Sequence, residues 1–366
     1  MVLLTVLLTS VRAGRKPIAI VAASVMLGVS GFVAASAHAE DTLNALIWCD
    51  HNDPNLLTPF EEANKVKVNV KEFEGTGAGL AIVAQSKPGD WDVMVIDSID
   101  VRQGVEKKLF EPLPEDKLPF ADMFPPVKMD TTTVVDGKRY GITEKYGYNA
   151  LSYNASKADP KDMAKMSVLW DPKYKGRIAV YDYYLPLIGM MAQGLGKKTA
   201  DLTEADLPAI KEKLIALKAN AKLVGDVASS QTALATGEVD ILAGGGEWVT
   251  AGLHKDNPAL EFTLPDEGGM LWSQSLAIFA SSTKKDLALK FVQYVMSPEG
   301  QARLATSACY WGMPSNQKAA LTADQKKLLR FDDQQAFFKR SQPYPAPSAD
   351  LDKKMQDMWT EVLQAK

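Results

Sequence analysis

Apolar stretches separated by polar loops predict a repeated strand–helix order in the first part of the chain. Leu43–Trp48 and Val66–Val70 have the short apolar or alternating pattern of strands, and Leu56–Ala63 between them has that of a helix. A glycine-rich loop, Glu74–Gly79, opens a helix through Gln85, and Asp92–Ile96 is a buried strand. This order is typical of an α/β lobe with mainly parallel strands.

The same order returns later and predicts a second lobe. Ile142–Asn154 is interpreted as a first crossover into it, and Ile178–Tyr181 and Glu238–Leu242 as strands. Between these strands, Thr203 with Asp206 three positions on predicts a capped helix whose apolar face holds Leu207, Ile210, Leu214 and Leu217.

The stretch Leu264–Ile278 (LPDEGGMLWSQSLAI) predicts a turn followed by a strand that returns to the first lobe. Trp272 and Gln274 are two positions apart, so they share one side of that strand. We expect this stretch to form one wall of a ligand cleft between the lobes. Ser297-Pro298 predicts the start of a later helix, and Thr322–Lys366 is predicted mostly helical.

The first 39 residues have the pattern of a secretory signal peptide. Arg12, Arg15 and Lys16 precede the apolar run Ile18–Ala35, and Ala37-His38-Ala39 ends it. An uncleaved membrane anchor is the alternative, because the run approaches the length of a spanning helix. We expect cleavage after Ala39 and a periplasmic protein.

Charge argues against a nucleic-acid partner. The chain has 41 basic and 45 acidic side chains, and without the three cations of the leader its net charge becomes −7. A basic stripe is the usual signature of nucleic-acid binding, and we find none.

Cysteine and histidine usage favours a binding protein over an enzyme. Cys49 and Cys309 permit one disulfide in an exported protein, but two free buried thiols fit equally well. Cys49 and His51 are two apart and would share a face of a strand, yet they match no cysteine-hydrolase signature. No zinc-ligand spacing occurs, and we predict no cofactor.

Polar and aromatic residues gather in loops that follow predicted strands. These loops are Trp48–Asp53, Asp97–Asp100, Asp182–Tyr184, Gly244–Trp248, Trp272–Gln274 and Cys309–Trp311. Ligands bind beyond the carboxyl ends of strands in such sheets. Aromatic faces attract cations and carboxylates fix ammonium groups, so these loops predict a site for an amine. Any one aromatic could instead pack in a core, and any one aspartate could cap a turn.

The triple glycine before Glu247 admits two interpretations. It could seat an anion at a helix N-terminus, or it could be a tight turn that needs small residues. It lacks the lysine and hydroxyl residue of a P-loop, and the carboxylate of Glu247 would repel an anion.

From Leu43 to Asn316 the chain resembles the spermidine/putrescine-type periplasmic solute-binding proteins of ABC importers. LWDPKYKGRI (169–178), GEVDI (237–241) and PDEGGMLWSQSLAI (265–278) carry the resemblance. It implies a two-lobe type II periplasmic binding protein, with each lobe a mainly parallel sheet flanked by helices and a hinge between discontinuous lobes. The implied boundaries are residues 40–146 with 273–316 for lobe 1, and 147–272 with 317–366 for lobe 2.

The resemblance also implies site residues, and the chain departs from some of them. Trp48 and Trp272 match stacking aromatics, Asp50 stands at an acid position, and His51 stands where the family often has tyrosine. The family's central aspartate is Gln274 here, and a further tryptophan is Ala243. These departures favour a smaller, less charged ligand than a polyamine. The predicted ligand-binding residues are Trp48, Asp50, His51, Asp97, Ser98, Asp182, Tyr183, Glu247, Trp272, Gln274 and Trp311.

The resulting prediction is a monomeric periplasmic protein that binds a small cationic or zwitterionic solute, a polyamine or related amine. Its expected partner is an inner-membrane ABC permease. Two alternatives stay open. One is a ferric-ion-binding protein of the same superfamily, in which Tyr183-Tyr184 with His51 and an aspartate would hold iron. The other is a periplasmic enzyme.

Overall fold

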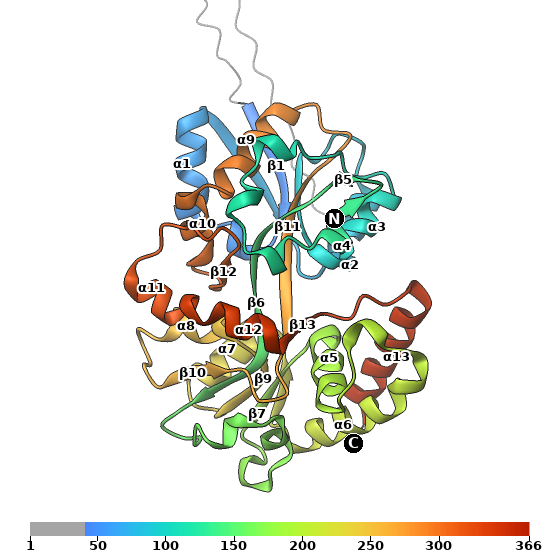
Figure 1. The fold of residues 1–366 in the computed structure, drawn as a ribbon, viewed down its shortest axis with the longest axis vertical. Coiled ribbons are helices and arrows are strands. Elements are labelled where there is room, and N and C mark those ends of the chain that lie inside the picture. The colour runs from blue at the N-terminus through green and yellow to red at the C-terminus, as the bar shows by residue number, and fades with distance from the viewer. Residues whose placement is uncertain (1–40, 366) are drawn as a thin grey trace, which may run out of the picture. The chain divides into compact units, whose positions relative to one another are not determined.

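The strands of the chain are short except for two, and most of them lie in one sheet. The computed structural model describes residues 41–365 (Figure 1), and the predicted leader lies outside these residues. The strands are β1 (Asp41–Ile47), β2 (Val66–Glu72), β3 (Val93–Asp97), β4 (Val134–Val135), β5 (Lys138–Arg139), β6 (Ile142–Asn154), β7 (Ile178–Tyr181), β8 (Leu223–Gly225), β9 (Ile241–Gly245), β10 (Leu260–Thr263), β11 (Gly269–Ile278), β12 (Met313–Pro314) and β13 (Ser341–Pro343).

The helices begin largely where the sequence supplies caps. Ser297 accepts a hydrogen bond from the Gly300 amide and Pro298 is the first helical residue, as predicted. The α-helices are α1 (Pro54–Asn64), α2 (Thr76–Gln85), α3 (Val101–Glu106), α4 (Asp130–Thr133), α5 (Tyr184–Gly194), α6 (Leu207–Asn220), α7 (Val227–Ala235), α8 (Glu247–Leu253), α9 (Lys285–Val295), α10 (Pro298–Ala305), α11 (Ala323–Leu328), α12 (Gln334–Arg340) and α13 (Ala349–Gln364).

Two parallel groups of strands stand at the ends of the sheet and antiparallel pairs join them. The main order is β2-β1-β3-β11-β6-β9-β7-β8. β1 pairs in parallel with β2 and β3, and β7 pairs in parallel with β8 and β9. The predicted α/β, mainly parallel fold is therefore confirmed.

The long strand β6 connects the two groups. Its thirteen residues are all buried. Its first part pairs with β11 and β12 and its last part with β9 and β10, so the ladder partners change along its length. The registers shift between Gln274 and Ser275 and between Ala150 and Leu151. β6 and β11 run side by side through the middle of Figure 1, as expected for crossover strands.

Separate hydrophobic cores stabilise the two groups of strands. One core joins β1, β3, α1 and α9, and a second joins β7, β9, α5, α6 and α13. All four residues of the predicted apolar face of α6 are buried in the second core. A third cluster lies around Tyr146 and Tyr148 of β6 and includes Phe337 of α12. The C-terminal tail is mostly helical as predicted, although β13, which pairs with β11, was not predicted.

Candidate functional site

A cavity lined mainly by aromatic side chains lies where strands of both groups end. The cavity and its open mouth together hold about 410 Å³ of space free of atoms. The lining residues are Trp48, Asp97, Asn149, Tyr181, Tyr183, Val227, Trp248, Trp272, Gln274, Tyr310 and Tyr344.

Strand ends and strand register bring the polar lining residues together. Asp97 is the last residue of β3, and its register partner on the neighbouring strand β11 is Gln274. Directly opposed residues of an antiparallel pair point to the same face, so both side chains reach the cavity. Trp272 is two positions from Gln274 and also lines the cavity, which confirms the predicted shared face.

The aromatic walls come from distant parts of the chain. Trp272 packs edge-on against Tyr310, with ring centroids 6.3 Å apart. The rings of Tyr183 and Tyr344 are 5.7 Å apart and also meet edge-on. Rings that present their faces to a desolvated cation attract it by about 0.5–2 kcal/mol each. The cavity therefore has the surroundings of a site for an organic cation.

Asp97 supplies the negative charge of the cavity. Its side chain is buried and accepts hydrogen bonds from the Thr76 hydroxyl at 3.3 Å and the Tyr183 hydroxyl at 3.4 Å. Burial and the nearby carboxylate of Asp100 raise the pKa of Asp97 to about 7, and the two hydrogen bonds oppose this rise. A bound cation would stabilise the ionised form.

Several polar atoms of the cavity lack a partner. Within residues 41–365, Nε1 of Trp48, Nε1 of Trp248 and Oε1 of Gln274 are buried and make no hydrogen bond. Burying such atoms costs free energy unless a ligand or water satisfies them. These two donors and one acceptor belong to side chains that line the cavity together with Asp97.

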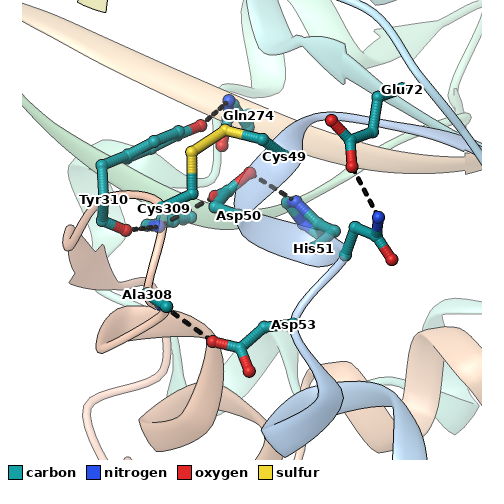
Figure 2. The surroundings of a disulfide bond; sticks show 11 residues. Cys49, Asp50, His51, Asp53, Glu72, Gln274, Ala308, Cys309 and Tyr310 are labelled. Carbon is teal, nitrogen blue, oxygen red and sulfur yellow. Dashed lines mark hydrogen bonds and ion pairs between the residues drawn. A yellow bond between two sulfur atoms is a disulfide. The ribbon is translucent and has the colours of Figure 1, made fainter. Parts of the chain in front are cut away.

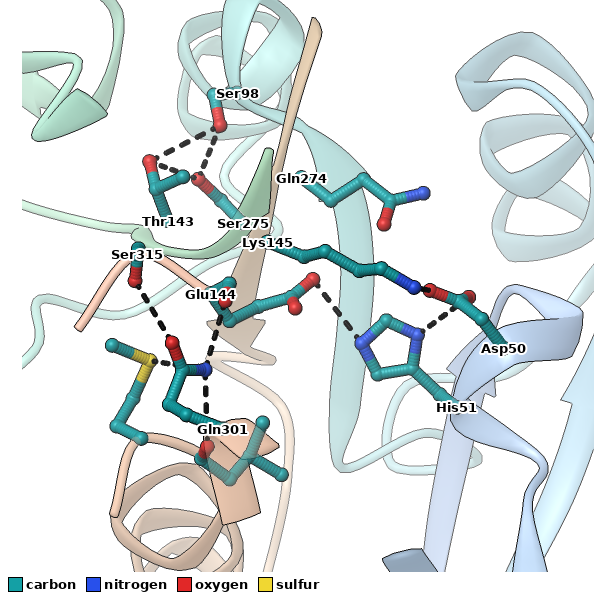
Figure 3. A network of polar contacts seen from close by, with 12 residues as sticks. Asp50, His51, Ser98, Thr143, Glu144, Lys145, Gln274, Ser275, Gln301 and Ser315 are labelled. Atoms are coloured by element: carbon teal, nitrogen blue, oxygen red, sulfur yellow. Dashed lines mark hydrogen bonds and ion pairs between the residues drawn. The ribbon is translucent and has the colours of Figure 1, made fainter. Parts of the chain in front are cut away.

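Asp50 and His51 do not line the cavity, contrary to prediction. Both are fully buried, and the Asp50 carboxylate binds Lys145 Nζ at 2.8 Å and His51 Nδ1 at 2.9 Å (Figure 3). His51 Nε2 lies 3.1 Å from Glu144 Oε1. We call Asp50, His51, Glu144 and Lys145 the buried charge cluster.

The charges in this cluster compensate one another. Burial alone would raise the pKa of Asp50, but the charges of His51 and Lys145 outweigh it and lower that pKa well below its usual range. Burial would likewise lower the pKa of His51, but Asp50 and Glu144 raise it to about 10. Both neighbouring carboxylates thus favour the protonated form of His51, and the sequence alone could not show this.

Ser98 and Asp182 also lie away from the cavity lining. Ser98 is buried, and its hydroxyl lies 2.7 Å from that of Ser275 on β11 (Figure 3). The side chain of Asp182 is exposed and accepts a hydrogen bond from Nε1 of Trp359 in α13. Both side chains make contacts between elements of the chain.

Glu247 and Trp311 are also not among the residues that line the cavity. Glu247 is buried behind Trp272 and accepts from the Tyr148 amide at 3.2 Å. Gly147 makes room for this arrangement, because a Cβ there would come within 1.8 Å of Glu247 Oε1 and 2.5 Å of Trp272. Burial raises the pKa of Glu247 to about 8.

Trp311 packs beside Gly252 of α8, outside the cavity. The glycines before Glu247 form the end of β9 and a tight connection, which agrees with the turn interpretation.

A disulfide joins two walls of the cavity. Cys49 and Cys309 are bonded with their Cα atoms 6.0 Å apart, which resolves the question that the sequence left open (Figure 2). Cys49 follows Trp48, and Cys309 precedes Tyr310. The bond therefore fixes these two lining residues relative to each other.

Comparison with known proteins identifies the family. A sequence model of the bacterial extracellular solute-binding proteins matches residues 55–331. The chain belongs to this family. The spermidine/putrescine-binding periplasmic protein of Escherichia coli K12 is 25% identical over 294 residues, which cover 79% of this chain and 81% of that protein.

Solved structures share the fold of this solute-binding protein. The spermidine/putrescine ABC transporter substrate-binding protein PotD from Streptococcus pneumoniae has a TM-score of 0.73 at 20% identity and covers 89% of this chain and 99% of its own. The binding protein MotA from A. tumefaciens B6, in complex with glucopine, has a TM-score of 0.70 at 18% identity and covers 88% and 99%. The predicted two-lobe architecture and the predicted family resemblance are both confirmed.

Membership of this family also supports the predicted class of protein, but it does not identify the ligand. Its named members are solute-binding proteins of ABC transporters, several of them called periplasmic, and this supports a non-enzyme. None of the helices in residues 41–365 is long and apolar enough to cross a membrane.

The ferric-ion alternative is not favoured. The Tyr183 hydroxyl donates to Asp97, whereas the Tyr184 hydroxyl donates to Asp352 of α13 at 2.6 Å. His51 is held in the buried charge cluster. The residues proposed for iron thus do not converge, although Fe(III) needs several oxygen ligands in one shell.

Sequence reasoning missed part of the lining. Tyr310 and Trp248 belong to segments that the sequence predicted as candidate loops, although Trp248 lies in α8, and the placement of aromatics after predicted strands was the signal for them. Asn149 lies inside β6 and Tyr344 in the C-terminal tail, where no local pattern distinguishes them. The Tyr344 hydroxyl donates to Asn149 Oδ1 across 195 residues of sequence.

Proposed function

We propose that this solute-binding protein captures a small amine with one positive end, such as a monocation or a zwitterion, in the aromatic cavity. The observation that carries the proposal is the charge of the lining, because Asp97 is its one carboxylate within residues 41–365. We further propose that the protein works as a periplasmic monomer after loss of residues 1–39. It would deliver the solute to an inner-membrane ABC permease.

The names of the relatives support an amine but do not select one. The E. coli relative is named for spermidine and putrescine, which carry two or more ammonium groups. Of the acids predicted to bind the ligand, Asp97 lines the cavity, whereas Asp50 is paired inside the protein. A second ammonium group of a ligand would therefore lack a carboxylate partner.

The unpartnered atoms refine the expected ligand. Its ammonium group would bind the Asp97 carboxylate and Gln274 Oε1, both acceptors, with aromatic faces around its alkyl part. The indole N–H groups of Trp48 and Trp248 would donate to an acceptor group elsewhere on the ligand. A zwitterion would satisfy all four groups, namely the carboxylate, the amide oxygen and the two indole N–H groups.

Closure of the two lobes would complete the site. We propose the lobe boundaries predicted above, residues 40–146 with 273–316 and 147–272 with 317–366. Asp97 then belongs to one lobe and Tyr183 to the other, and their hydrogen bond spans the cleft. Ligand that binds both lobes stabilises the closed form, which is the usual hinge mechanism.

A ligand screen tests the proposal. The chain is purified from the periplasm and melted with monoamines, quaternary amines, amino acids, polyamines and ferric citrate. A ligand at 100 times its Kd should stabilise the fold by about 2.7 kcal/mol. Stabilisation by a monocation or zwitterion, and not by spermidine or ferric citrate, is the expected result. Stabilisation by spermidine alone, or by no amine, would contradict the proposal.

A further inference from the structure

One row of side chains crosses three neighbouring strands at the cavity. Asp97 of β3 is the register partner of Gln274 of β11, and Gln274 is in turn the register partner of Lys145 of β6. Directly opposed residues share a face, so the row runs carboxylate, amide, ammonium. Figure 3 shows the side chains of Gln274 and Lys145 extending side by side in the same direction. The first two line the cavity, and Lys145 comes next to them.

Lys145 does not reach the cavity because its ammonium group is already bound. Nζ donates to Asp50 Oδ2 at 2.8 Å and to the Tyr310 carbonyl at 3.0 Å. The ring of Tyr310 covers it, with the centroid 4.2 Å from Nζ. Tyr310 lines the cavity, and its hydroxyl accepts from Gln274 Nε2 at 2.8 Å. One aromatic residue thus separates the Lys145 ammonium from the ligand space.

The surroundings of Nζ are those of an amine-binding site. A carboxylate, a carbonyl oxygen and an aromatic face are the groups that hold an alkylammonium ligand. Here a four-carbon chain from β6 delivers the ammonium group, so no exogenous amine can bind Asp50. Within the buried charge cluster, Asp50 is already paired with both Lys145 and His51.

We propose that Lys145 is an internal ammonium group that occupies a second amine position beside the cavity and thereby restricts the ligand to one positive end. The inference rests on the proposed function and names the residue that sets its specificity. A purely structural Lys145 would tie β6 to the segment after β1 without influencing which amine binds. The two roles differ in what happens when the side chain is removed.

Alanine at position 145 removes the competing ammonium and leaves space beside Gln274. Asp50 then has His51 as its remaining cationic partner, and an ammonium group from a ligand restores the lost charge. We expect Lys145→Ala to bind a linear diamine at least tenfold tighter than the monoamine of equal length. The wild-type protein should show no such preference.

The experiment compares diamines of three to six carbons with matched monoamines by calorimetry, on chains exported to the periplasm. Asp50→Asn with Lys145→Ala is the matched control, since it keeps the space and removes the acid, and it should lose the preference. Lys145→Met should also lack it, because its side chain fills the space without a charge. If Lys145→Ala does not fold without ligand, the variant is refolded with a diamine or with the matched monoamine. The diamine must then restore a cooperative melting transition, and the monoamine must not.

The outcomes separate this inference from the proposed function. Suppose that the wild type binds a monoamine, while Lys145→Ala shows no preference for the diamine and is not rescued by it. The role of Lys145 is then wrong, and the proposed function stands. A diamine preference already present in the wild type overturns it too. If the wild type binds no amine while Lys145→Ala takes up a diamine, the internal amine position stands and the proposed function falls. If no amine binds either protein, both are wrong.

Discussion

The affinity for a cationic ligand should depend steeply on pH, because Asp97 must be ionised to bind it. Burial and the charge of Asp100 raise the pKa of Asp97 to about 7 in the free protein. Below pH 7 the ligand must expel the proton of Asp97, so the apparent affinity should fall roughly tenfold per pH unit, or about 1.4 kcal/mol. An alkylamine stays protonated throughout this range, since its pKa is near that of lysine at about 10.4. We therefore expect binding roughly tenfold weaker at pH 6 than at pH 8, and roughly hundredfold weaker at pH 5.

Calorimetry measures both the affinity and the proton. The best amine of the screen is titrated at pH 5.5, 6.5, 7.5 and 8.5, in two buffers that differ in ionisation enthalpy. The difference between buffers should show close to one proton released per ligand at the lowest pH and almost none at the highest. A flat affinity profile, or no proton release at pH 5.5, would refute the role given to Asp97.

Asp100 provides a sharp control. It lies outside the cavity lining, yet its charge helps to raise the pKa of Asp97. Asp100→Asn should therefore move the midpoint of the affinity profile to lower pH. Asp97→Asn should flatten the profile and weaken binding at high pH. Identical profiles for these two variants would contradict the assignment.

The same raised pKa has a consequence for the free protein. The folded state holds the Asp97 proton more tightly than the unfolded chain does, so protonation of Asp97 stabilises the fold. This stabilisation is fully present below the ordinary pKa of 3.8 and is lost as the pH rises through about 7. A cation bound to the ionised carboxylate offsets the loss. The stabilisation produced by a fixed excess of ligand should thus be larger at pH 8 than at pH 6.

Three further changes test other parts of the site. Trp272→Ala should weaken ligand binding at least tenfold with the fold intact, whereas Trp170→Ala, outside the cavity lining, should not; equal affinities by calorimetry would remove Trp272 from the site. Reducing the Cys49–Cys309 disulfide, which closes a separation of 260 residues, should lower the free energy of unfolding in urea by up to about 5 kcal/mol; unchanged midpoints with and without reductant would argue against it. Burial raises the pKa of Glu247 to about 8, so the wild-type protein should lose stability as the pH rises from about 5 through 8, and Glu247→Gln should not show this loss. If the wild type and Glu247→Gln show the same change in melting temperature between pH 5, 7 and 9, the burial of Glu247 is wrong.

The elements that the sequence predicted correctly depend on neighbouring residues. The capping box of Thr203 and Asp206 occurs, although it caps a short 3₁₀ turn directly before α6. Trp272 and Gln274 share a face because strand alternation alone requires it. Such features need no knowledge of distant contacts, which is why caps, strands and the shared wall of the cavity could be found from the sequence.

Asp50 does not line the cavity because of a partner far along the chain. Asp50 and Asp97 look equivalent in the sequence, because each is an acid in a loop after a strand. They differ because Lys145, 95 residues beyond Asp50, binds one of them and not the other. Nothing local marks that lysine as buried. Tyr344 enters the cavity from the C-terminal tail for the same reason, through a tertiary contact without a sequence pattern.

The pairing of buried charges bears on which ligands the proposed site can take. A buried charge is costly unless it is paired, and removing one partner of a buried pair destabilises a protein by about 3–5 kcal/mol. Asp50 therefore needs a cation at all times, whether from the chain or from a ligand. With Lys145 in place Asp50 is paired before any ligand arrives, and Asp97 is the one carboxylate that lines the cavity within residues 41–365. Changing the ligand from one positive end to two then requires a change at position 145, and neither the strands nor the lobes need to move.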